Sequence, residues 1–216
     1  MEPFSALTAI AAPLDELNLD TNQLSPTRFN KVPYNAADYS RILLHDRRFR
    51  GDGTEIAEFV LNREPYRRAR ILVGDRNFGC GSSRESAAMS LKAFGVRVVI
   101  APSFGDIFSK NCAGAGVVLA RVDDEAAARL RRLITEKPGT EITVDLAAQT
   151  IAIQSVAADG DGQAIHFDIS PLAKSRLLKG LDAIQVVRGL LPEIEAFERQ
   201  YLAATPWLAP PRITAP

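Results

Sequence analysis

The most chemically suggestive stretch of the sequence is RNFGCGSSRESAAMSLKAFG, residues 76–95, in which two serines and an arginine follow a glycine turn. An apolar run precedes the turn, and a helix-like pattern follows it. A turn of this kind exposes backbone N–H groups at the positive end of a helix, so it favours an anion. Arg84 can bind a carboxylate through two parallel hydrogen bonds, and the hydroxyls of Ser82 and Ser83 can donate or accept a proton.

The spacing of this turn does not match three common phosphate or nucleophile motifs. It lacks the closing Gly-Lys-Ser/Thr of a P-loop and the third glycine of a dinucleotide-binding turn. It also lacks the Gly-x-Ser-x-Gly of an esterase, because Arg84 stands where the second glycine belongs. A structural alternative stays open, since Ser82 and Glu85 have the spacing of a helix capping box. Capping alone does not explain Arg84, because a cation at a helix N-terminus is disfavoured unless an anion binds there.

The elements that must position this turn alternate between strand-like and helix-like patterns. Residues 69–74 and 96–102 indicate buried strands, on either side of a helix over 84–94 that ends at Gly95. Further along the chain we expect helices at 103–116 and 123–137, strands at 117–122, within 140–155 and at 164–170, and helices over 171–203 that break near Gly180 and Pro192.

The segments before the first buried strand are less regular. Residues 1–34 indicate strands and loops rather than a long helix. Residues 38–70 are rich in arginine with interspersed carboxylates, which predicts a solvated, partly flexible surface. A docking face for a partner or an anionic substrate is the alternative for that segment.

The composition narrows the classes of protein to which the chain can belong. With 216 residues, 46% of them hydrophobic, it can bury a core in one large domain or two small ones. Its 26 basic residues equal its 26 acidic ones, so no overall positive field would attract nucleic acid. We see neither a secretory signal pattern nor a window of membrane-spanning length. We therefore expect a cytoplasmic protein that binds neither nucleic acid nor membranes.

The two cysteines, Cys80 and Cys112, have no neighbouring Cys or His at metal-ligand spacing. We therefore expect no metal site in this chain, and two cysteines alone do not supply the ligands of an iron–sulfur cluster. A disulfide between them is an alternative, although such bonds are uncommon in a reducing compartment.

The stretch NFGCGSSRE resembles the signature of the 3-isopropylmalate dehydratase small subunit, the swivelling-domain member of the aconitase superfamily. Three more stretches are similar to that family: LDTNQLSP at 19–26, VVIAPSFGDIFSKNCAGAGVV at 98–118 and LLKGLDAI at 177–184. The resemblance implies an α/β fold of the swivelling β/β/α type, with a mixed sheet flanked by helices. It implies a domain over residues 1–202, followed by a proline-rich tail over 203–216.

The same resemblance implies an activity and a partner. Small subunits of this family pair with a large subunit that carries a [4Fe–4S] cluster, and this chain would bind no cofactor itself. The pair would act on a small dicarboxylate, interconverting 2-isopropylmalate and 3-isopropylmalate by dehydration and rehydration in leucine biosynthesis. A related subunit acting on a citramalate-type or dimethylmalate-type compound is one alternative, and a non-catalytic anion-binding assembly module is another.

Residue roles follow from the resemblance at the positions that match its motifs. Ser82 corresponds to the catalytic base, which removes the proton alpha to a carboxylate. Ser83 and Arg84 correspond to substrate-binding residues, and the backbone amide of Gly81 would help to stabilise the base. Supporting positions near the site are Asp20, Thr21 and Glu85.

Three positions depart from the usual family pattern. Ser86 replaces a histidine after Arg-Glu, and Asn22 replaces the second aspartate of Asp-Thr-Asp. The loop that recognises the alkyl group of the substrate in many members, expected over residues 33–52, begins with VPYNAADYSRIL at 32–43 here. These departures leave the identity of the substituted malate open, because they alter the surroundings of the Ser-Ser-Arg centre.

Overall fold

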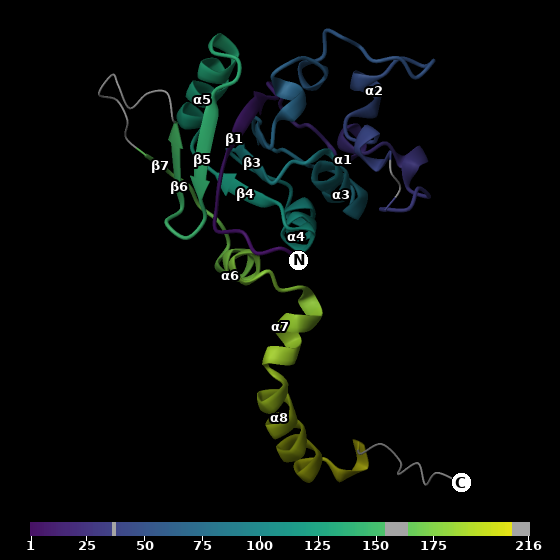
Figure 1. Cartoon of the computed structure of the whole chain (residues 1–216). Coiled ribbons are helices and arrows are strands. Elements are labelled where there is room, and N and C mark those ends of the chain that lie inside the picture. The colour runs from purple at the N-terminus through teal and green to yellow at the C-terminus, as the bar shows by residue number, and fades with distance from the viewer. Residues whose placement is uncertain (36–37, 154–163, 209–216) are drawn as a thin grey trace. The chain divides into compact units, whose positions relative to one another are not determined.

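The computed structural model describes residues 1–35, 38–153 and 164–208. The chain divides into two compact units, Met1–Gly180 and Leu181–Pro216 (Figure 1).

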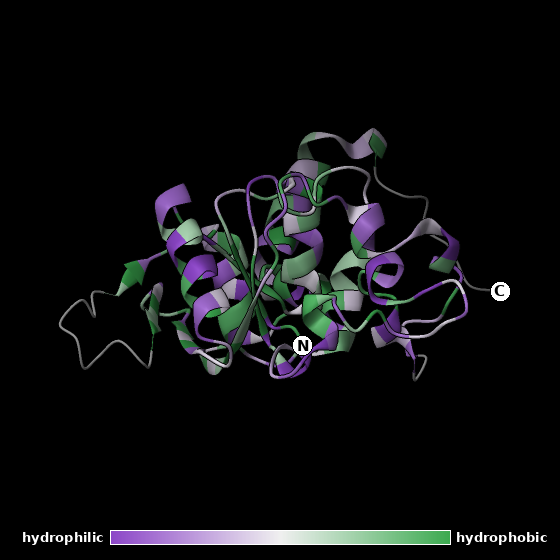
Figure 2. Ribbon diagram, turned by 90° about the horizontal axis from the view of Figure 1, so that it is seen from above, coloured by the Kyte–Doolittle hydropathy of each residue, from purple (hydrophilic) through white to green (hydrophobic). Residues whose placement is uncertain are grey.

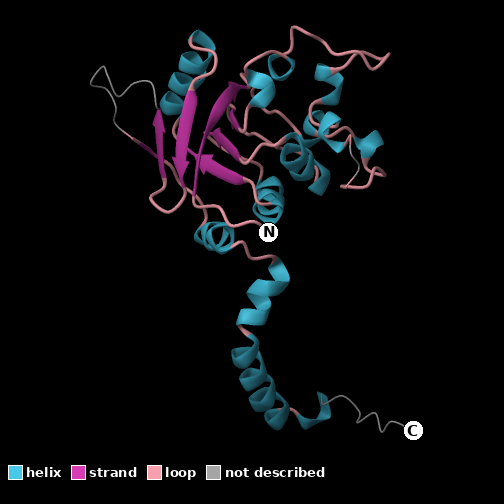
Figure 3. Ribbon diagram, viewed as in Figure 1, coloured by secondary structure: helices cyan, strands magenta, loops and turns pink. Residues whose placement is uncertain are grey.

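The unit Met1–Gly180 is built on a mixed sheet that has seven strands within the described residues, in the order β4-β3-β2-β1-β5-β6-β7 (Figure 3). Neighbours in the series β1 to β4 pair in parallel, whereas β1 pairs with β5, β5 with β6, and β6 with β7 in antiparallel fashion. This arrangement confirms the predicted mixed sheet flanked by helices. The strands are β1 (Ala6–Pro13), β2 (Ile71–Val73), β3 (Val98–Ala101), β4 (Val118–Arg121), β5 (Glu141–Asp145), β6 (Thr150–Ile153) and β7 (Ile165–His166).

The parallel strands are apolar on both faces because helices cover both. In β2, Ile71 and Val73 belong to one hydrophobic core, whereas Leu72 belongs to the other. Side chains along a strand alternate between the faces of the sheet, so a strand that contributes to two cores is a continuous apolar run. Figure 2 shows the central strands mostly in the hydrophobic colour, with hydrophilic residues concentrated on the surrounding helices and loops.

Helices α3 (Glu85–Phe94) and α4 (Asp106–Ala115) pack on one face of the sheet, and α5 (Asp124–Glu136) and α6 (Pro171–Lys179) contribute to the core on the other (Figure 1). All four lie where the sequence predicts helices. Gly95 ends α3 and Gly116 ends α4, each in the left-handed conformation that glycine adopts without steric cost.

The prediction of a solvated surface over 38–70 is right for most of its arginines, which are exposed, but wrong for its apolar residues, which join the core. The described residues of this segment fold into a series of short helices, and Leu43, Leu61 and Tyr66 are buried. Arg48 is also buried, because its guanidinium donates to the backbone oxygens of Ser40 and Leu43 and to the side-chain oxygen of Asn62. Burial lowers the pKa of Arg48 to about 10.

The short helices from the N-terminal segment onward are α1 (Thr21–Leu24), η1 (Thr27–Phe29), η2 (Tyr39–Arg41), α2 (His45–Arg48), η3 (Val60–Asn62) and η4 (Tyr66–Arg68).

The unit Leu181–Pro216 contains α7 (Ala183–Gly189), α8 (Leu191–Ala204) and η5 (Pro206–Leu208). Both predicted breaks are confirmed, because α6 ends just before Gly180 and α7 and α8 are separated at Leu190. Pro192 lies in the first turn of α8, where proline is tolerated. Residues 209–216 of the predicted tail lie outside the described residues, and the 1–202 domain stays a prediction. Large apolar side chains are exposed along this unit: Ile184, Val187, Leu190, Leu191, Ile194, Phe197, Tyr201, Trp207 and Leu208. In the described part of the chain, no helix is both long enough and apolar enough to cross a membrane.

Candidate active site

The glycine-serine turn lies between β2 and α3, as the sequence predicts. Gly81 has a φ of +93°, a left-handed conformation that disfavours any side chain. Helix α3 begins at Glu85, and Arg84 is its N-cap residue without a side-chain capping bond. Ser82 therefore lies before the cap, and the alternative of a Ser82–Glu85 capping box is wrong. The extended backbone of Arg84 delays the start of the helix beyond the reach of Ser82.

Two neighbouring segments hold the backbone just before the turn. One segment, residues 18–21, follows β1, and the other, residues 103–105, follows β3. Four backbone hydrogen bonds make these connections: Gly79 N to Leu19 O at 2.7 Å, Thr21 N to Cys80 O at 2.9 Å, Phe78 N to Ser103 O at 3.0 Å and Gly105 N to Phe78 O at 3.0 Å. The turn is therefore part of a three-segment layer at the ends of parallel strands, and not a free loop.

Glycine at two positions allows these segments to approach closely. A Cβ atom on Gly105 would lie 2.4 Å from the carbonyl oxygen of Gly79. A Cβ atom on Gly79 would lie 2.3 Å from the ring of Phe108. Both separations are far below van der Waals contact, so the layer requires glycine at both positions.

The hydroxyls of Ser82 and Ser83 remain open to solvent. Both residues are exposed, and neither hydroxyl forms a hydrogen bond with any described residue. The backbone carbonyl of Ser82 is anchored, because it accepts a hydrogen bond from Thr21 Oγ1 at 2.9 Å. The turn thus combines a fixed backbone with two accessible hydroxyls at the N-terminus of α3.

The guanidinium of Arg84 is fixed at one end. Its Nη1 donates to Asn22 Oδ1 at 3.1 Å and to Thr27 Oγ1 at 2.5 Å. Asn22 Oδ1 also accepts hydrogen bonds from the backbone N–H of Thr27 at 3.1 Å and from the Thr27 hydroxyl at 2.7 Å. The sequence singles out Asn22 only as a departure from the family pattern. Its contact with Arg84 could not be predicted, because the two residues are far apart in the sequence.

Asp20 and Thr21 lie beside the turn but act on backbone groups. Asp20 caps α1, because its Oδ1 accepts hydrogen bonds from the N–H groups of Asn22 at 2.8 Å and Gln23 at 2.7 Å. The Gln23 side chain accepts from the N–H of Asp20 in return, which completes a capping box. Thr21 is buried and anchors Ser82. The N-terminal motif thus meets the turn and supports its backbone.

Glu85 is exposed and lies close enough to two tyrosines to influence them. Burial raises the pKa of Tyr39 to about 12, and the charges of Tyr34 and Glu85 add to that effect. Tyr34 is half exposed and meets the Tyr39 ring edge to face at 5.5 Å. The hydroxyl of Tyr39 is buried without a hydrogen-bond partner among the described residues. Sequence patterns did not identify this tyrosine pair, because its position depends on packing of the 38–70 segment.

Comparisons with known proteins agree with this geometry. The family profile described as the aconitase C-terminal domain matches residues 1–125, which include the turn, and a second profile, LeuD_N, matches residues 128–171. The chain is 39% identical to a 3-isopropylmalate dehydratase small subunit of Roseobacter denitrificans, with 96% of this chain and all of that protein covered. It is 41% identical to a protein of the same name from Caulobacter vibrioides, with 96% and 99% covered.

The chain belongs to the 3-isopropylmalate dehydratase small-subunit family. The recognition from the sequence is therefore confirmed. A crystal structure of a 3-isopropylmalate dehydratase, LeuD, from Methanocaldococcus jannaschii is similar at a TM-score of 0.57 and 20% identity, with 88% of this chain and 99% of that chain covered. That similarity supports the fold.

The cysteines of this small-subunit family member are both free. Cys112 is fully buried in α4, and burial raises the pKa of its thiol well above the usual value. Cys80 is partly buried, and burial together with the Asp20 charge raises the pKa of its thiol. Neither thiol has the lowered pKa of a reactive cysteine. Across residues 1–35, 38–153 and 164–208, no group of three or more His, Cys, Asp or Glu side chains could hold a metal ion.

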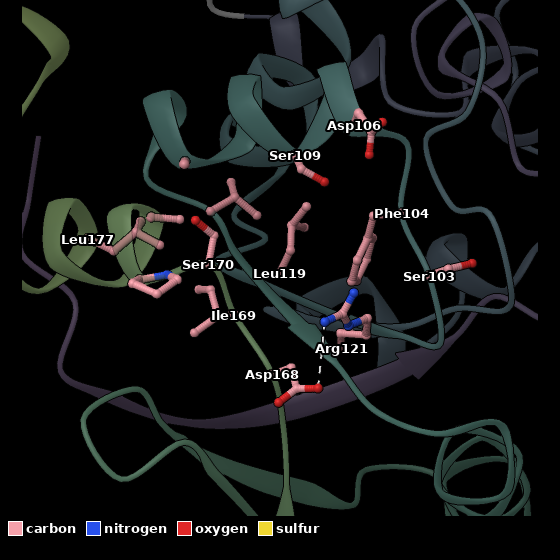
Figure 4. A pocket seen from close by; sticks show the side chains of 14 residues that line it. Ser103, Phe104, Asp106, Ser109, Leu119, Arg121, Asp168, Ile169, Ser170 and Leu177 are labelled. Atoms are coloured by element: carbon pink, nitrogen blue, oxygen red, sulfur yellow. Dashed lines mark ion pairs between the residues drawn. The ribbon is translucent and has the colours of Figure 1, made fainter.

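A pocket of about 480 Å³ lies elsewhere in the Met1–Gly180 unit and is lined from α4, β4 and α6 (Figure 4). Arg121 and Asp168 face each other at its edge, with 3.6 Å between Nη2 and Oδ2, and both side chains are more than half exposed. None of the residues predicted for the site lines this pocket. The Ser82 and Ser83 side chains of the turn are exposed instead.

Proposed function

We propose that this chain is the small subunit of a 3-isopropylmalate dehydratase, a hydro-lyase that isomerises 2-isopropylmalate to 3-isopropylmalate in leucine biosynthesis. The observation that carries the proposal is identity of about 40% over nearly the full length of relatives bearing that name. The relatives from Roseobacter denitrificans and Caulobacter vibrioides both carry it, which favours this function over another substituted malate or a non-catalytic assembly module.

Ser82 is the proposed catalytic base. Its exposed hydroxyl lies on an anchored backbone at the N-terminus of α3, so an approaching substrate can reach it. In the dehydration step the deprotonated serine oxygen takes the proton from the carbon alpha to a carboxylate. The electron pair of that C–H bond forms the C=C bond as the adjacent carbon releases its hydroxyl, which takes up a proton and leaves as water. Addition of water with the opposite regiochemistry then gives the isomer. The helix dipole and the backbone amides around Gly81 stabilise the negative charge on a serine oxygen.

Arg84 and Ser83 are the proposed substrate-binding groups. Three of the five N–H donors of Arg84, on Nε and Nη2, have no partner among the described residues, so they are free to bind a carboxylate. The exposed Ser83 hydroxyl can donate to the same substrate. Asp20, Thr21 and Glu85 are the proposed supporting residues. Hydrogen bonds of Asp20 and Thr21 to backbone groups support this role for those two residues.

The [4Fe–4S] cluster that the aconitase relationship implies does not fit the residues of this chain. The sequence holds only two cysteines, one of which is fully buried. We therefore propose that a large subunit carries the cluster and that the two proteins assemble into the active enzyme. Such a cluster supplies a Lewis acid for the hydroxyl that leaves.

Reconstitution tests this proposal. The chain would be mixed with a separately purified, cluster-loaded large subunit, and isomerisation would be followed through the absorbance of the unsaturated intermediate. We expect activity only from the mixture, and 3-isopropylmalate as a better substrate than citramalate or dimethylmalate. A mixture that assembles but prefers another substituted malate would contradict the substrate assignment, and one that never assembles would contradict the partner.

A further inference from the structure

The side chain of Asn22 brings three hydrogen-bond donors to a single oxygen. The backbone N–H and hydroxyl of Thr27 and Nη1 of Arg84 all donate to Asn22 Oδ1, at distances between 2.7 and 3.1 Å. A backbone N–H and a guanidinium N–H can only donate, so the atom that they face must be the amide oxygen. The orientation of the Asn22 amide is therefore fixed by its partners.

This cluster engages one end of the Arg84 guanidinium and leaves one edge of it free. Nη1 has two N–H groups, and it has two acceptors, Asn22 Oδ1 and Thr27 Oγ1. Three donors remain, one on Nε and two on Nη2. The Nε–H and one N–H of Nη2 point in the same direction along one edge of the planar group. That edge is one of the two that can bind both oxygens of a carboxylate at once.

The cluster orients the guanidinium without neutralising it. Both acceptors of Nη1 are uncharged, and Arg84 forms no ion pair within the described ranges. Other arginines of the chain are paired with carboxylates, as Arg76 is with Asp124. A positive charge that is held in place but unpaired, at an exposed turn, suits an anionic ligand.

We propose that Asn22, supported by Thr27, is a positioning residue that presents the Nε–Nη2 edge of Arg84 to the substrate carboxylate. The inference rests on the proposed function, because that function supplies the carboxylate. Only the oxygen of the Asn22 side chain is used, and its Nδ2 has no partner in the described part of the chain. An aspartate at this position would accept the same hydrogen bonds and add a negative charge, so it separates orientation from charge.

The test compares three variants of the full chain. Asn22→Ala removes the acceptor, Asn22→Asp keeps it, and Asn30→Ala is the matched control, because the Asn30 side chain accepts from Ser86 and does not contact Arg84. NMR of the arginine side-chain N–H groups, assigned with Arg84→Lys, reports on the guanidinium without any need for activity. We expect slowly exchanging Nη1 protons in the wild type, in Asn22→Asp and in Asn30→Ala, and their loss in Asn22→Ala.

The same variants in the reconstituted enzyme test the consequence for the substrate. We expect Asn22→Ala to raise KM about tenfold and Asn30→Ala to match the wild type. Asn22→Asp keeps the orientation of the guanidinium but places a negative charge against it, so we expect this variant also to raise KM, although its Nη1 protons stay protected. Unchanged Nη1 protons in Asn22→Ala, or an unchanged KM, would overturn the proposal. If Asn22→Ala does not fold, Thr27→Val with Thr27→Ser as control gives the same comparison. Failure of the wild-type pair to isomerise its substrate would count against the proposed function alone, because the NMR result stands without it.

Discussion

Thr21 Oγ1 donates a hydrogen bond to the backbone carbonyl of Ser82 at 2.9 Å, across 61 residues of sequence. Thr21 is almost fully buried, whereas the Ser82 side chain is exposed. The N-terminal segment therefore anchors the backbone of the turn on its buried side and leaves the Ser82 side chain exposed.

Loss of this anchor should affect both stability and turnover. Thr21→Val keeps the shape of the side chain but removes the donor, which leaves the Ser82 carbonyl without its partner. We expect the free energy of unfolding to fall by about 1–2 kcal/mol and kcat in the reconstituted enzyme to fall as well. Thr21→Ser keeps the hydroxyl and serves as the control. Chemical denaturation and steady-state kinetics measure the two effects, and a wild-type kcat for Thr21→Val would mean that the anchor does not position Ser82.

Arg84→Lys tests the carboxylate clamp. A lysine keeps the charge but cannot form two parallel hydrogen bonds or hold both Asn22 and Thr27. We expect KM to rise because binding of the substrate carboxylate weakens in the ground state, and kcat to fall because a lysine holds that carboxylate less precisely in the transition state. Kinetics that match the wild type would remove Arg84 from the substrate contacts.

The close approach of two backbones predicts a severe effect of a single methyl group. A Cβ atom at Gly105 would lie 2.4 Å from the Gly79 carbonyl oxygen, so Gly105→Ala must push apart the layer that holds the turn. We expect a loss of about 3 kcal/mol or more in stability, in the range of severe packing defects. Gly51→Ala is the matched control, because nothing lies within 4 Å of its added Cβ. Thermal unfolding of both variants measures the difference, and equal melting temperatures would contradict the observed packing.

The buried hydroxyl of Tyr39 predicts an unusual dependence of stability on pH. Its pKa is raised to about 12 in the folded protein, whereas an unfolded tyrosine ionises near 10. Between these values the unfolded state loses a proton that the folded state keeps, so stability falls as pH rises. Tyr39→Phe lacks this ionisation and the unpartnered hydroxyl. We expect the variant to be at least as stable at pH 7, and increasingly more stable than the wild type above pH 10.

Denaturation of both proteins at pH 7 and across pH 9 to 12 measures this difference. The comparison cancels the contributions of Tyr34 and Tyr66, whose pKa values are also raised by burial. A constant gap between variant and wild type over the whole range would show that Tyr39 titrates normally.

Local patterns in the sequence predicted the parts of the fold that depend on local physics. The apolar run at Ile71–Val73, the helix that Gly95 ends and the short antiparallel pair around residues 141–153 were all expected. The order of the strands in the sheet was not predicted. Strand β1 pairs with β2 on one side and with β5 on the other, and no pattern within Ala6–Pro13 specifies these neighbours.

The candidate site divides in a similar way. Ser82, Ser83 and Arg84 were identified from one short motif, since their chemistry and spacing lie within it. Asn22 and Tyr39 were not assigned a place at the site, because their partners are brought near by folding. The burial of Arg48 could not be predicted for the same reason. The sequence does not indicate which arginine of an arginine-rich segment will donate to backbone carbonyls in the folded protein.

The central claim is that the Ser82 hydroxyl, presented on an anchored turn, is the base of a reaction completed by a second subunit. Ser82→Ala tests it most directly, measured as kcat in the enzyme reconstituted with the cluster-bearing large subunit, alongside assembly by size-exclusion chromatography. The account predicts normal assembly with a loss of turnover on the order of a hundredfold or more. Normal assembly with full turnover would contradict it.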